Sequence, residues 1–137
     1  MYLLDSDVLI WHLRGHEPTV RLLRELAQER REEEGEGVSP LGCSVISVFE
    51  VRVGMRPEEE EATERLLSVL ERYVVDESIA ERAADYYRSF ARQGIMLHIA
   101  DLLIAATASL YRLVLVTYNR DHFPMEDVRL YEPMPEF

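Results

Sequence analysis

The sequence of 137 residues is long enough for one domain with a single buried core, which we expect to span residues 1–137. A formal net charge of −11 argues against a broadly basic nucleic-acid-binding surface, because phosphate contacts draw on clustered Lys and Arg. No apolar run approaches the roughly 20 residues of a membrane-spanning helix, a basic leader is absent, and one cysteine, Cys43, cannot form an intramolecular disulfide, so we expect a soluble cytoplasmic protein.

The first half of the chain alternates short strands with helices. Residues 1–4 predict a buried strand ending at Asp5, and Asp7 is the expected N-cap of a helix over residues 8–14. A second helix begins at residues 17–18, and its apolar stripe gives way to charge over residues 28–37, where we expect a solvated helix end and a loop. Residues 41–46 predict the next strand, and Ser47 is the expected N-cap of a helix that carries Glu50 near its first turn.

The second half continues this alternation. Helices are predicted over residues 58–70, 78–93 and 98–111, with a strand-like connector at residues 74–76 and Asp101 in the first turn of the third helix. Residues 113–117 form the clearest strand, residues 118–123 a loop, and residues 128–131 a last short strand. Short strands alternating with helices predict an α/β fold with a parallel sheet flanked by helices.

Carboxylates stand at three distant points in apolar surroundings, at Asp5, Glu50 and Asp101. Burying a carboxylate costs several kcal/mol unless a cation or hydrogen bonds compensate. Sites in parallel sheets lie beyond the carboxyl ends of strands, where Asp5, Asn119 and Asp121 are expected. Oxygen ligands without paired His or Cys favour Mg²⁺ or Mn²⁺ over Zn²⁺, and such ions activate water for phosphodiester hydrolysis.

Four segments, taken in order, resemble those of PIN-domain proteins, and among them the VapC-type toxin ribonucleases. They are YLLDSDVLI at residues 2–10, SVISVFEV at 44–51 followed by Gly54, IADLLIAATA at 99–108 and LVTYNRDHF at 115–123. The resemblance implies a PIN-like three-layer sandwich and a metal-dependent endoribonuclease that hydrolyses RNA with a metal-activated water. It also implies the toxin of a type II toxin–antitoxin pair, a homodimer, and an antitoxin protein as partner.

The resemblance also assigns roles to particular residues. Asp5, Glu50 and Asp101 would be the acidic metal-site residues, Ser6 their hydroxyl neighbour and Asn119 the polar residue of the final motif. The sequence departs from the family at the fourth acid: family members often have Asp three residues after the Asn, where this chain has His122. Asp121 stands one residue earlier, so whether Asp121 or His122 replaces the fourth acid is open.

Simpler interpretations remain beside these. Asp5 can be a turn residue at a strand end, and Glu50 and Asp101 can be first-turn acids that complement helix dipoles. A zinc site at His98 and His122 is disfavoured, because no further His or Cys stands at ligand spacing. The alternative function is a catalytically weak PIN domain that binds RNA or a protein, and a phosphatase or a DNA nuclease is a further rival.

Overall fold

The computed structural model describes residues 1–35, 37 and 41–136. These residues form a five-stranded, fully parallel sheet in the order β3-β2-β1-β4-β5. The strands are β1 (Tyr2–Leu4), β2 (Leu41–Ser44), β3 (Glu71–Tyr73), β4 (Val114–Val116) and β5 (Arg129–Leu130). The α-helices are α1 (Ser6–Leu13), α2 (Glu17–Glu34), α3 (Val45–Gly54), α4 (Glu60–Ser68), α5 (Glu77–Arg92) and α6 (Ile99–Tyr111), with 3₁₀ turns η1 (Pro57–Glu59) and η2 (Arg120–His122).

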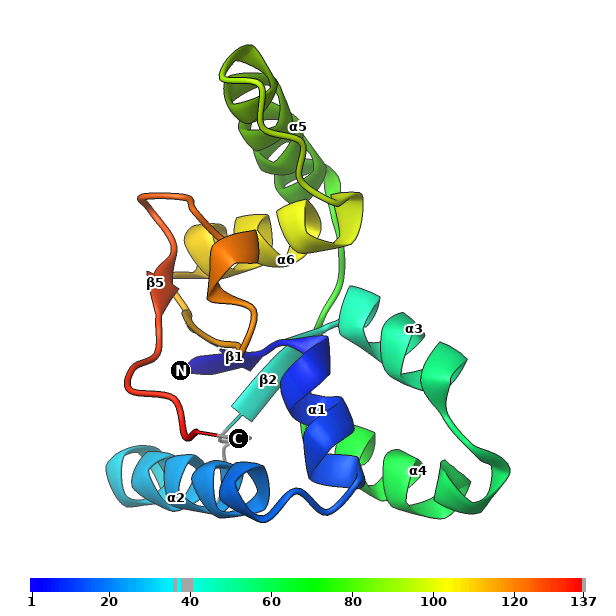
Figure 1. The fold of residues 1–137 in the computed structure, drawn as a ribbon. Coiled ribbons are helices and arrows are strands. Elements are labelled where there is room, and N and C mark those ends of the chain that lie inside the picture. The colour runs from blue at the N-terminus through cyan, green and yellow to red at the C-terminus, as the bar shows by residue number, and fades with distance from the viewer. Residues whose placement is uncertain (36, 38–40, 137) are drawn as a thin grey trace.

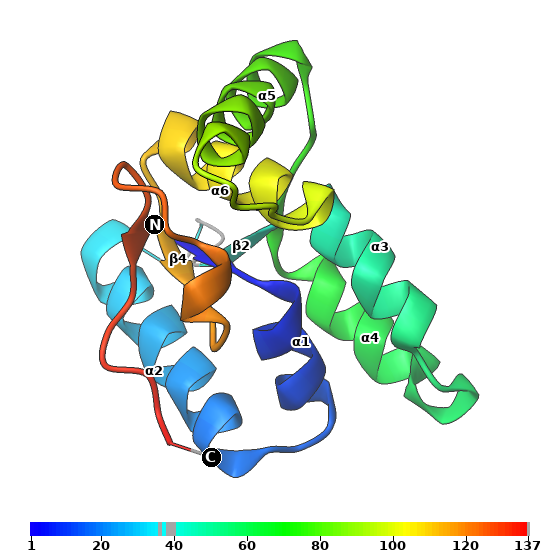
Figure 2. The same ribbon diagram turned by 45° about the horizontal axis from the view of Figure 1, so that its top comes forward.

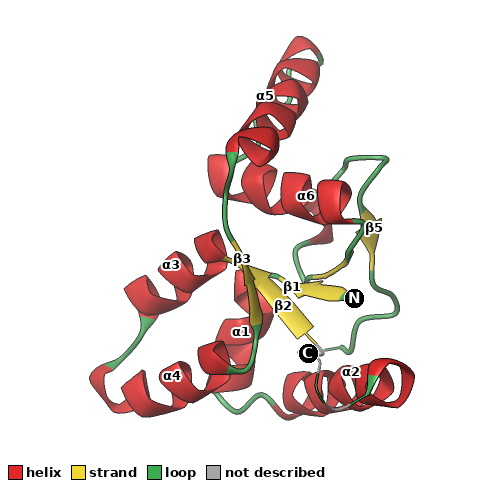
Figure 3. Cartoon of the chain, turned by 180° about the vertical axis from the view of Figure 1, so that it is seen from behind, coloured by secondary structure: helices red, strands yellow, loops and turns green. Residues whose placement is uncertain are grey.

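Helices cover both faces of the sheet, so the predicted α/β fold with a flanked parallel sheet is confirmed (Figures 1 and 3). Successive strand residues point to opposite faces. Leu3 and Leu115 pack with Ile104 in a core beneath α5 and α6. Leu4 and Val116 belong to a second core, which helices α1 to α4 complete from the other side. None of the described helices is long and apolar enough to cross a bilayer.

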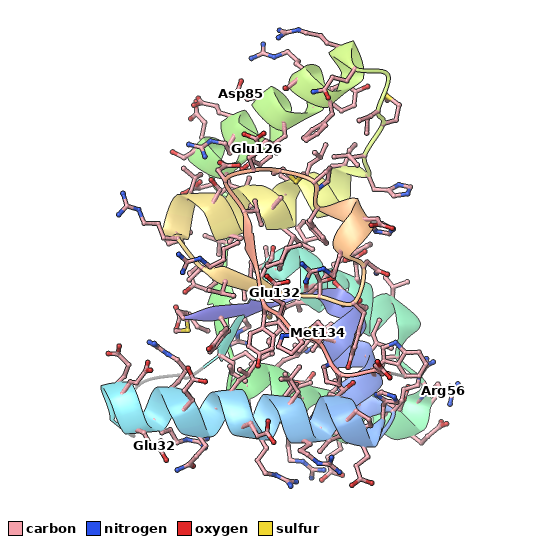
Figure 4. All side chains as sticks on the ribbon, turned by 60° about the vertical axis from the view of Figure 1, so that its left-hand side comes forward. Glu32, Arg56, Asp85, Glu126, Glu132 and Met134 are labelled. Atoms are coloured by element: carbon pink, nitrogen blue, oxygen red, sulfur yellow. The ribbon has the colours of Figure 1, made fainter. Side chains whose placement is uncertain are left out.

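Helix α2 extends further than its apolar stripe predicts. We expected a solvated helix end and a loop over residues 28–37, and the helix continues to Glu34. Arg30 forms ion pairs with Glu33 at 3.0 Å and Glu34 at 3.2 Å, one turn further along the helix. Pairs at this spacing stabilise a helix. These ion pairs therefore stabilise the last turns of α2, where few apolar side chains pack against the core. Glu32 points outward from this part of the helix (Figure 4). Of the predicted loop, residues 36 and 38–40 lie outside the described residues.

Two predicted N-caps are wrong by a few residues. Asp5, and not Asp7, caps α1, and its carboxylate accepts a hydrogen bond from the Ser6 amide. Ser44, and not Ser47, caps α3, and its hydroxyl accepts from the Ile46 amide. In both cases the helix begins directly at the end of the strand, because the last residue of the strand or the one after it already supplies the cap.

The third strand was also misplaced. The strand is Glu71–Tyr73 rather than residues 74–76, and it pairs with β2 with Gly42 opposite Glu71. Asp76 instead caps α5, accepting a hydrogen bond from the Ile79 amide at 2.9 Å. The side chain of residue 76 therefore serves the following helix, and the strand has to end before it.

The strand order reverses beside the central strand, and we call the region at the carboxyl ends of β1 and β4 the crevice. From β1 the chain builds β2 and β3 on one side of the sheet, and it then returns to place β4 and β5 on the other side. Parallel α/β sheets bind ligands at the carboxyl ends of the strands where the order reverses in this way. In this protein that point lies between β1 and β4, next to the start of α1 (Figure 2).

Candidate active site

Asp5 lies at the carboxyl end of β1 and is 4% exposed. Its Oδ1 accepts a hydrogen bond from the Ser6 amide at 2.8 Å, and its Oδ2 accepts one from the Thr117 hydroxyl at 2.7 Å. Burial raises the pKa of Asp5 to about 7; the negative charge of Asp7 adds to the rise and the two hydrogen bonds oppose it. The structure therefore holds a carboxylate where its charge is disfavoured, which confirms the burial expected from the sequence.

Asp7 is a site residue that the sequence analysis missed. Its Oδ1 accepts from the Val8 amide at 2.7 Å, and its Oδ2 accepts from the Tyr118 amide at 3.0 Å, which ties α1 to the loop after β4. Burial raises the pKa of Asp7, and the charge of Asp101 acts in the same direction. The available signal was the spacing of Asp5 and Asp7, which places both carboxylates at the strand end with only Ser6 between them.

Glu50 reaches the same crevice from α3. The Ser6 hydroxyl donates to Glu50 Oε1 at 2.6 Å and lies 2.9 Å from the Ser47 hydroxyl oxygen. Ser47 is fully buried, so it lines the contact between α1 and α3 instead of capping a helix. Ser6 thus has the place that the resemblance implies, as a hydroxyl beside an acidic residue.

Asp101 lies in the first turn of α6, as predicted, and pairs with a histidine. Nδ1 of His122 is 3.2 Å from Asp101 Oδ2. Burial raises the pKa of the Asp101 carboxyl; His122 opposes this rise, Glu50 adds to it and His98 opposes it. The electrostatic influence of Glu50 on Asp101, and of Asp101 on Asp5, shows that the three predicted acids share one region of the fold.

The loop after β4 supplies the remaining predicted residues. Asn119 is exposed at the rim of the crevice, and its backbone amide donates to the Thr117 hydroxyl oxygen at 3.0 Å. Asp121 is exposed in η2, and its side chain has no hydrogen bond or ion pair with any described residue. In this loop it is His122, and not Asp121, that contacts one of the three predicted acids.

The donor chemistry of this region fits a hard divalent cation. Asp5, Asp7, Glu50 and Asp101 contribute carboxylate oxygens to this region, and burial, with the charge of Asp7 adding to it, raises the pKa of Asp5, so a bound cation would stabilise its ionised form. Within residues 1–35, 37 and 41–136, no three acidic, His or Cys side chains converge as a complete set of metal ligands. Several of the oxygens instead face protein partners, namely Ser6, Thr117 and His122.

Comparison with known proteins places this chain in a family. A model of the PIN domain matches residues 2–128. The chain is 41% identical over 125 residues to Ribonuclease VapC10 of Mycobacterium tuberculosis, an alignment covering 91% of this chain and 87% of the relative. It is 36% identical over 128 residues to Ribonuclease VapC19 of the same organism, with 91% and 94% covered.

A solved structure agrees with this. A toxin–antitoxin complex from Klebsiella pneumoniae contains a chain that superposes with a TM-score of 0.73 at 26% identity, covering 97% of this chain and all of that one. Because the family model spans nearly the whole sequence and two relatives exceed 30% identity over most of its length, this protein belongs to the PIN-domain family.

Proposed function

We propose that this protein is a Mg²⁺- or Mn²⁺-dependent endoribonuclease and the toxin of a type II toxin–antitoxin pair. The observation that carries the proposal is the buried Asp5 carboxylate at the β1/β4 crevice, with Asp7 and Asp101 as charged neighbours. The relatives named as ribonucleases support the reaction class, and the toxin–antitoxin complex supports the biological setting.

In this proposal Asp5, Glu50 and Asp101 hold the metal. When bound, the ion supplies an activated water and neutralises charge on the phosphodiester. The side chains around these acids orient them: the Thr117 hydroxyl fixes Asp5, and the Ser6 hydroxyl fixes Glu50. Asn119 offers an exposed amide at the rim, where it can donate to a phosphate oxygen of the substrate.

The test is cleavage of a mixed pool of structured RNA by purified protein with Mg²⁺ or Mn²⁺. We expect EDTA and the substitution Asp5→Asn each to abolish cleavage, whereas Asp85→Asn retains it. Asp85 is the matched control because it is an aspartate exposed on α5, where its side chain points away from the body of the protein (Figure 4). Equal cleavage by the Asp5→Asn variant would show that the activity comes from another site or another protein.

A second candidate function is an RNA- or protein-binding domain with weak turnover. The loop after β4 favours it, because the residue of this loop that contacts Asp101 is His122 and not a fourth acid. Metal-dependent binding of RNA without any cleavage, measured by gel shift on the same RNA pool, would support this function over the nuclease.

The antitoxin partner follows from the charge of the crevice. Unpaired acidic charge attracts basic side chains across an interface. We therefore expect an antitoxin segment with at least one Arg or Lys directed at Asp5 and Asp7, so that the bound partner takes the place of the cation. A complex whose affinity falls steeply with salt, and falls further in the Asp7→Asn variant, is the expected result.

A homodimer is the state we propose in solution. Four large apolar side chains of α3 and of residues 96–99, where α6 begins, are strongly exposed: Phe49 (66%), Val53 (71%), Met96 (67%) and Ile99 (71%). The start of α6 lies beside α3 (Figures 1 and 2). Exposed apolar patches of this kind commonly mark protein–protein contacts, and burial against a second copy would remove this one from water.

A further inference from the structure

Tyr118, in the loop after β4, is held by hydrogen bonds at both its backbone and its side chain. Its backbone N–H donates to Asp7 Oδ2 at 3.0 Å, in the first turn of α1. Its hydroxyl oxygen lies 2.6 Å from the hydroxyl oxygen of Thr19, which is 99 positions away in the first turn of α2. One residue of the loop is therefore attached to two different helices.

The Thr19 hydroxyl is a buried anchor for this contact. Thr19 is 0% exposed, and its Oγ1 also lies 2.8 Å from Nδ1 of His16, the residue at the N-cap position of α2. When Nδ1 of His16 accepts, Thr19 donates to it and Tyr118 donates to Thr19. When Nδ1 carries a proton, the direction of both hydrogen bonds is reversed. Both hydrogen bonds form in either case, so the contact between Tyr118 and Thr19 does not depend on the tautomer of His16.

The same loop carries Asn119, which follows Tyr118 directly and is exposed at the rim of the crevice. Its backbone amide donates to the Thr117 hydroxyl oxygen at 3.0 Å. Within the described part of the chain, its carboxamide has no hydrogen-bond partner. The position of this carboxamide is therefore set by the backbone that carries it, and the side chain of Tyr118 attaches that backbone to α2.

We propose that Tyr118 and Thr19 are positioning residues of the nuclease site. The hydrogen bond between their hydroxyls holds the loop after β4 so that the Asn119 carboxamide meets a phosphate oxygen of the RNA substrate. This inference rests on the proposed function, because it concerns the residue that the proposed reaction uses to contact RNA. It predicts that a hydroxyl on α2, away from the acids of the crevice, affects cleavage through Asn119.

The experiment is a double-mutant cycle on RNA cleavage with Mn²⁺. Tyr118→Phe keeps the aromatic ring, which packs against the core formed with α1 to α4, and removes only the hydroxyl. We expect kcat/KM to fall by about tenfold in Tyr118→Phe and in Thr19→Val, because a small displacement of a substrate contact slows the reaction. Thr19→Ser restores the hydroxyl and should be near wild type. Tyr87→Phe, at an exposed tyrosine of α5, is the matched control.

An Asn119→Ala background separates positioning from general destabilisation. If the hydroxyl acts through Asn119, then Tyr118→Phe causes little further loss of kcat/KM in that background. The same tenfold loss with and without the Asn119 side chain would overturn the proposal, as would full activity of Tyr118→Phe.

Amide hydrogen exchange, measured by NMR in EDTA without RNA, gives a second readout that needs no activity. The Tyr118 and Asn119 amides should exchange faster in Tyr118→Phe and Thr19→Val than in wild type, Thr19→Ser and Tyr87→Phe. Unchanged exchange at both amides would overturn the anchoring of the loop and leave the proposed function standing. A wild type that cleaves no RNA would instead overturn the proposed function, and faster exchange in Tyr118→Phe would then still support the anchoring of the loop.

Discussion

Replacing Asp5 by Asn should stabilise the metal-free protein at neutral and alkaline pH. Asp5 is almost completely buried, and its pKa in the folded protein is about 7. An Asn side chain fits the same hydrogen bonds, because its amide oxygen can accept from the Ser6 N–H and its NH₂ can donate to the Thr117 hydroxyl oxygen. The variant therefore removes the buried charge with little change in shape.

The magnitude follows from the pKa difference. An unfolded Asp titrates at about 3.9, so the folded value of about 7 is roughly 3 units higher, at about 1.4 kcal/mol per unit. Between these values the folded state binds more protons than the unfolded state, so the wild type loses stability as pH rises from about 4 to about 7. The loss is complete above that window and absent below it, with an upper limit of about 4 kcal/mol.

Urea denaturation in EDTA at intervals from pH 4 to pH 8 would measure this effect. The difference in unfolding free energy between Asp5→Asn and wild type should be near zero at pH 4 and favour the variant by up to about 4 kcal/mol at pH 8. Asp85→Asn should track the wild type at every pH. If Asp5→Asn is equal to or less stable than wild type at pH 8, then Asp5 is not a strained buried charge and the electrostatic basis of the proposed metal site fails.

Three further predictions concern neighbouring features. Thr117→Val removes the hydroxyl that donates to Asp5 and accepts from the Asn119 amide, so the free energy of unfolding should fall by about 1–3 kcal/mol, whereas Thr117→Ser stays near wild type in the same urea titration. Gly42→Ala places a Cβ 2.8 Å from the Tyr73 ring, and the resulting overpacking should cost about 1–3 kcal/mol; an unchanged melting temperature would refute the close approach. Val53→Glu should convert a dimer into a monomer in light scattering after gel filtration, and a wild type that is already monomeric at high concentration would rule out the apolar patch as a dimer interface.

Local patterns predicted most elements of this fold, and the failures have local causes as well. Strands β1 and β4 were placed closely because short apolar runs end at polar residues there. The exact end of α2 was not predicted, because the apolar stripe stops before it and carries no information on ion pairs such as that of Arg30 with Glu34. The caps of α1 and α3 were misplaced because two candidate side chains stood within three residues, and only the position of the strand end decides between them.

The acidic residues of the candidate site could be selected from the sequence, but the residues that contact them could not. Asp5, Glu50 and Asp101 could be selected because carboxylates in apolar runs require compensation. The role of Thr117 could not be predicted, because a threonine at a strand end is ordinary until the neighbouring strand is known to be β1. The contact between His122 and Asp101 likewise depends on the path of the loop after β4. The pattern of apolar and polar residues does not predict that path.

The position of β4 in the sheet has a consequence for how the protein is made. The hydrogen bond from Thr117 to Asp5 joins residues 112 positions apart, and β4 is a direct neighbour of β1. During synthesis the amino-terminal elements emerge first, but the crevice lacks one of its walls until the segment carrying Thr117 has left the ribosome. The site of the proposed nuclease can therefore be complete only after the segment carrying Thr117 has been made, and an antitoxin would meet a complete site only from that point on.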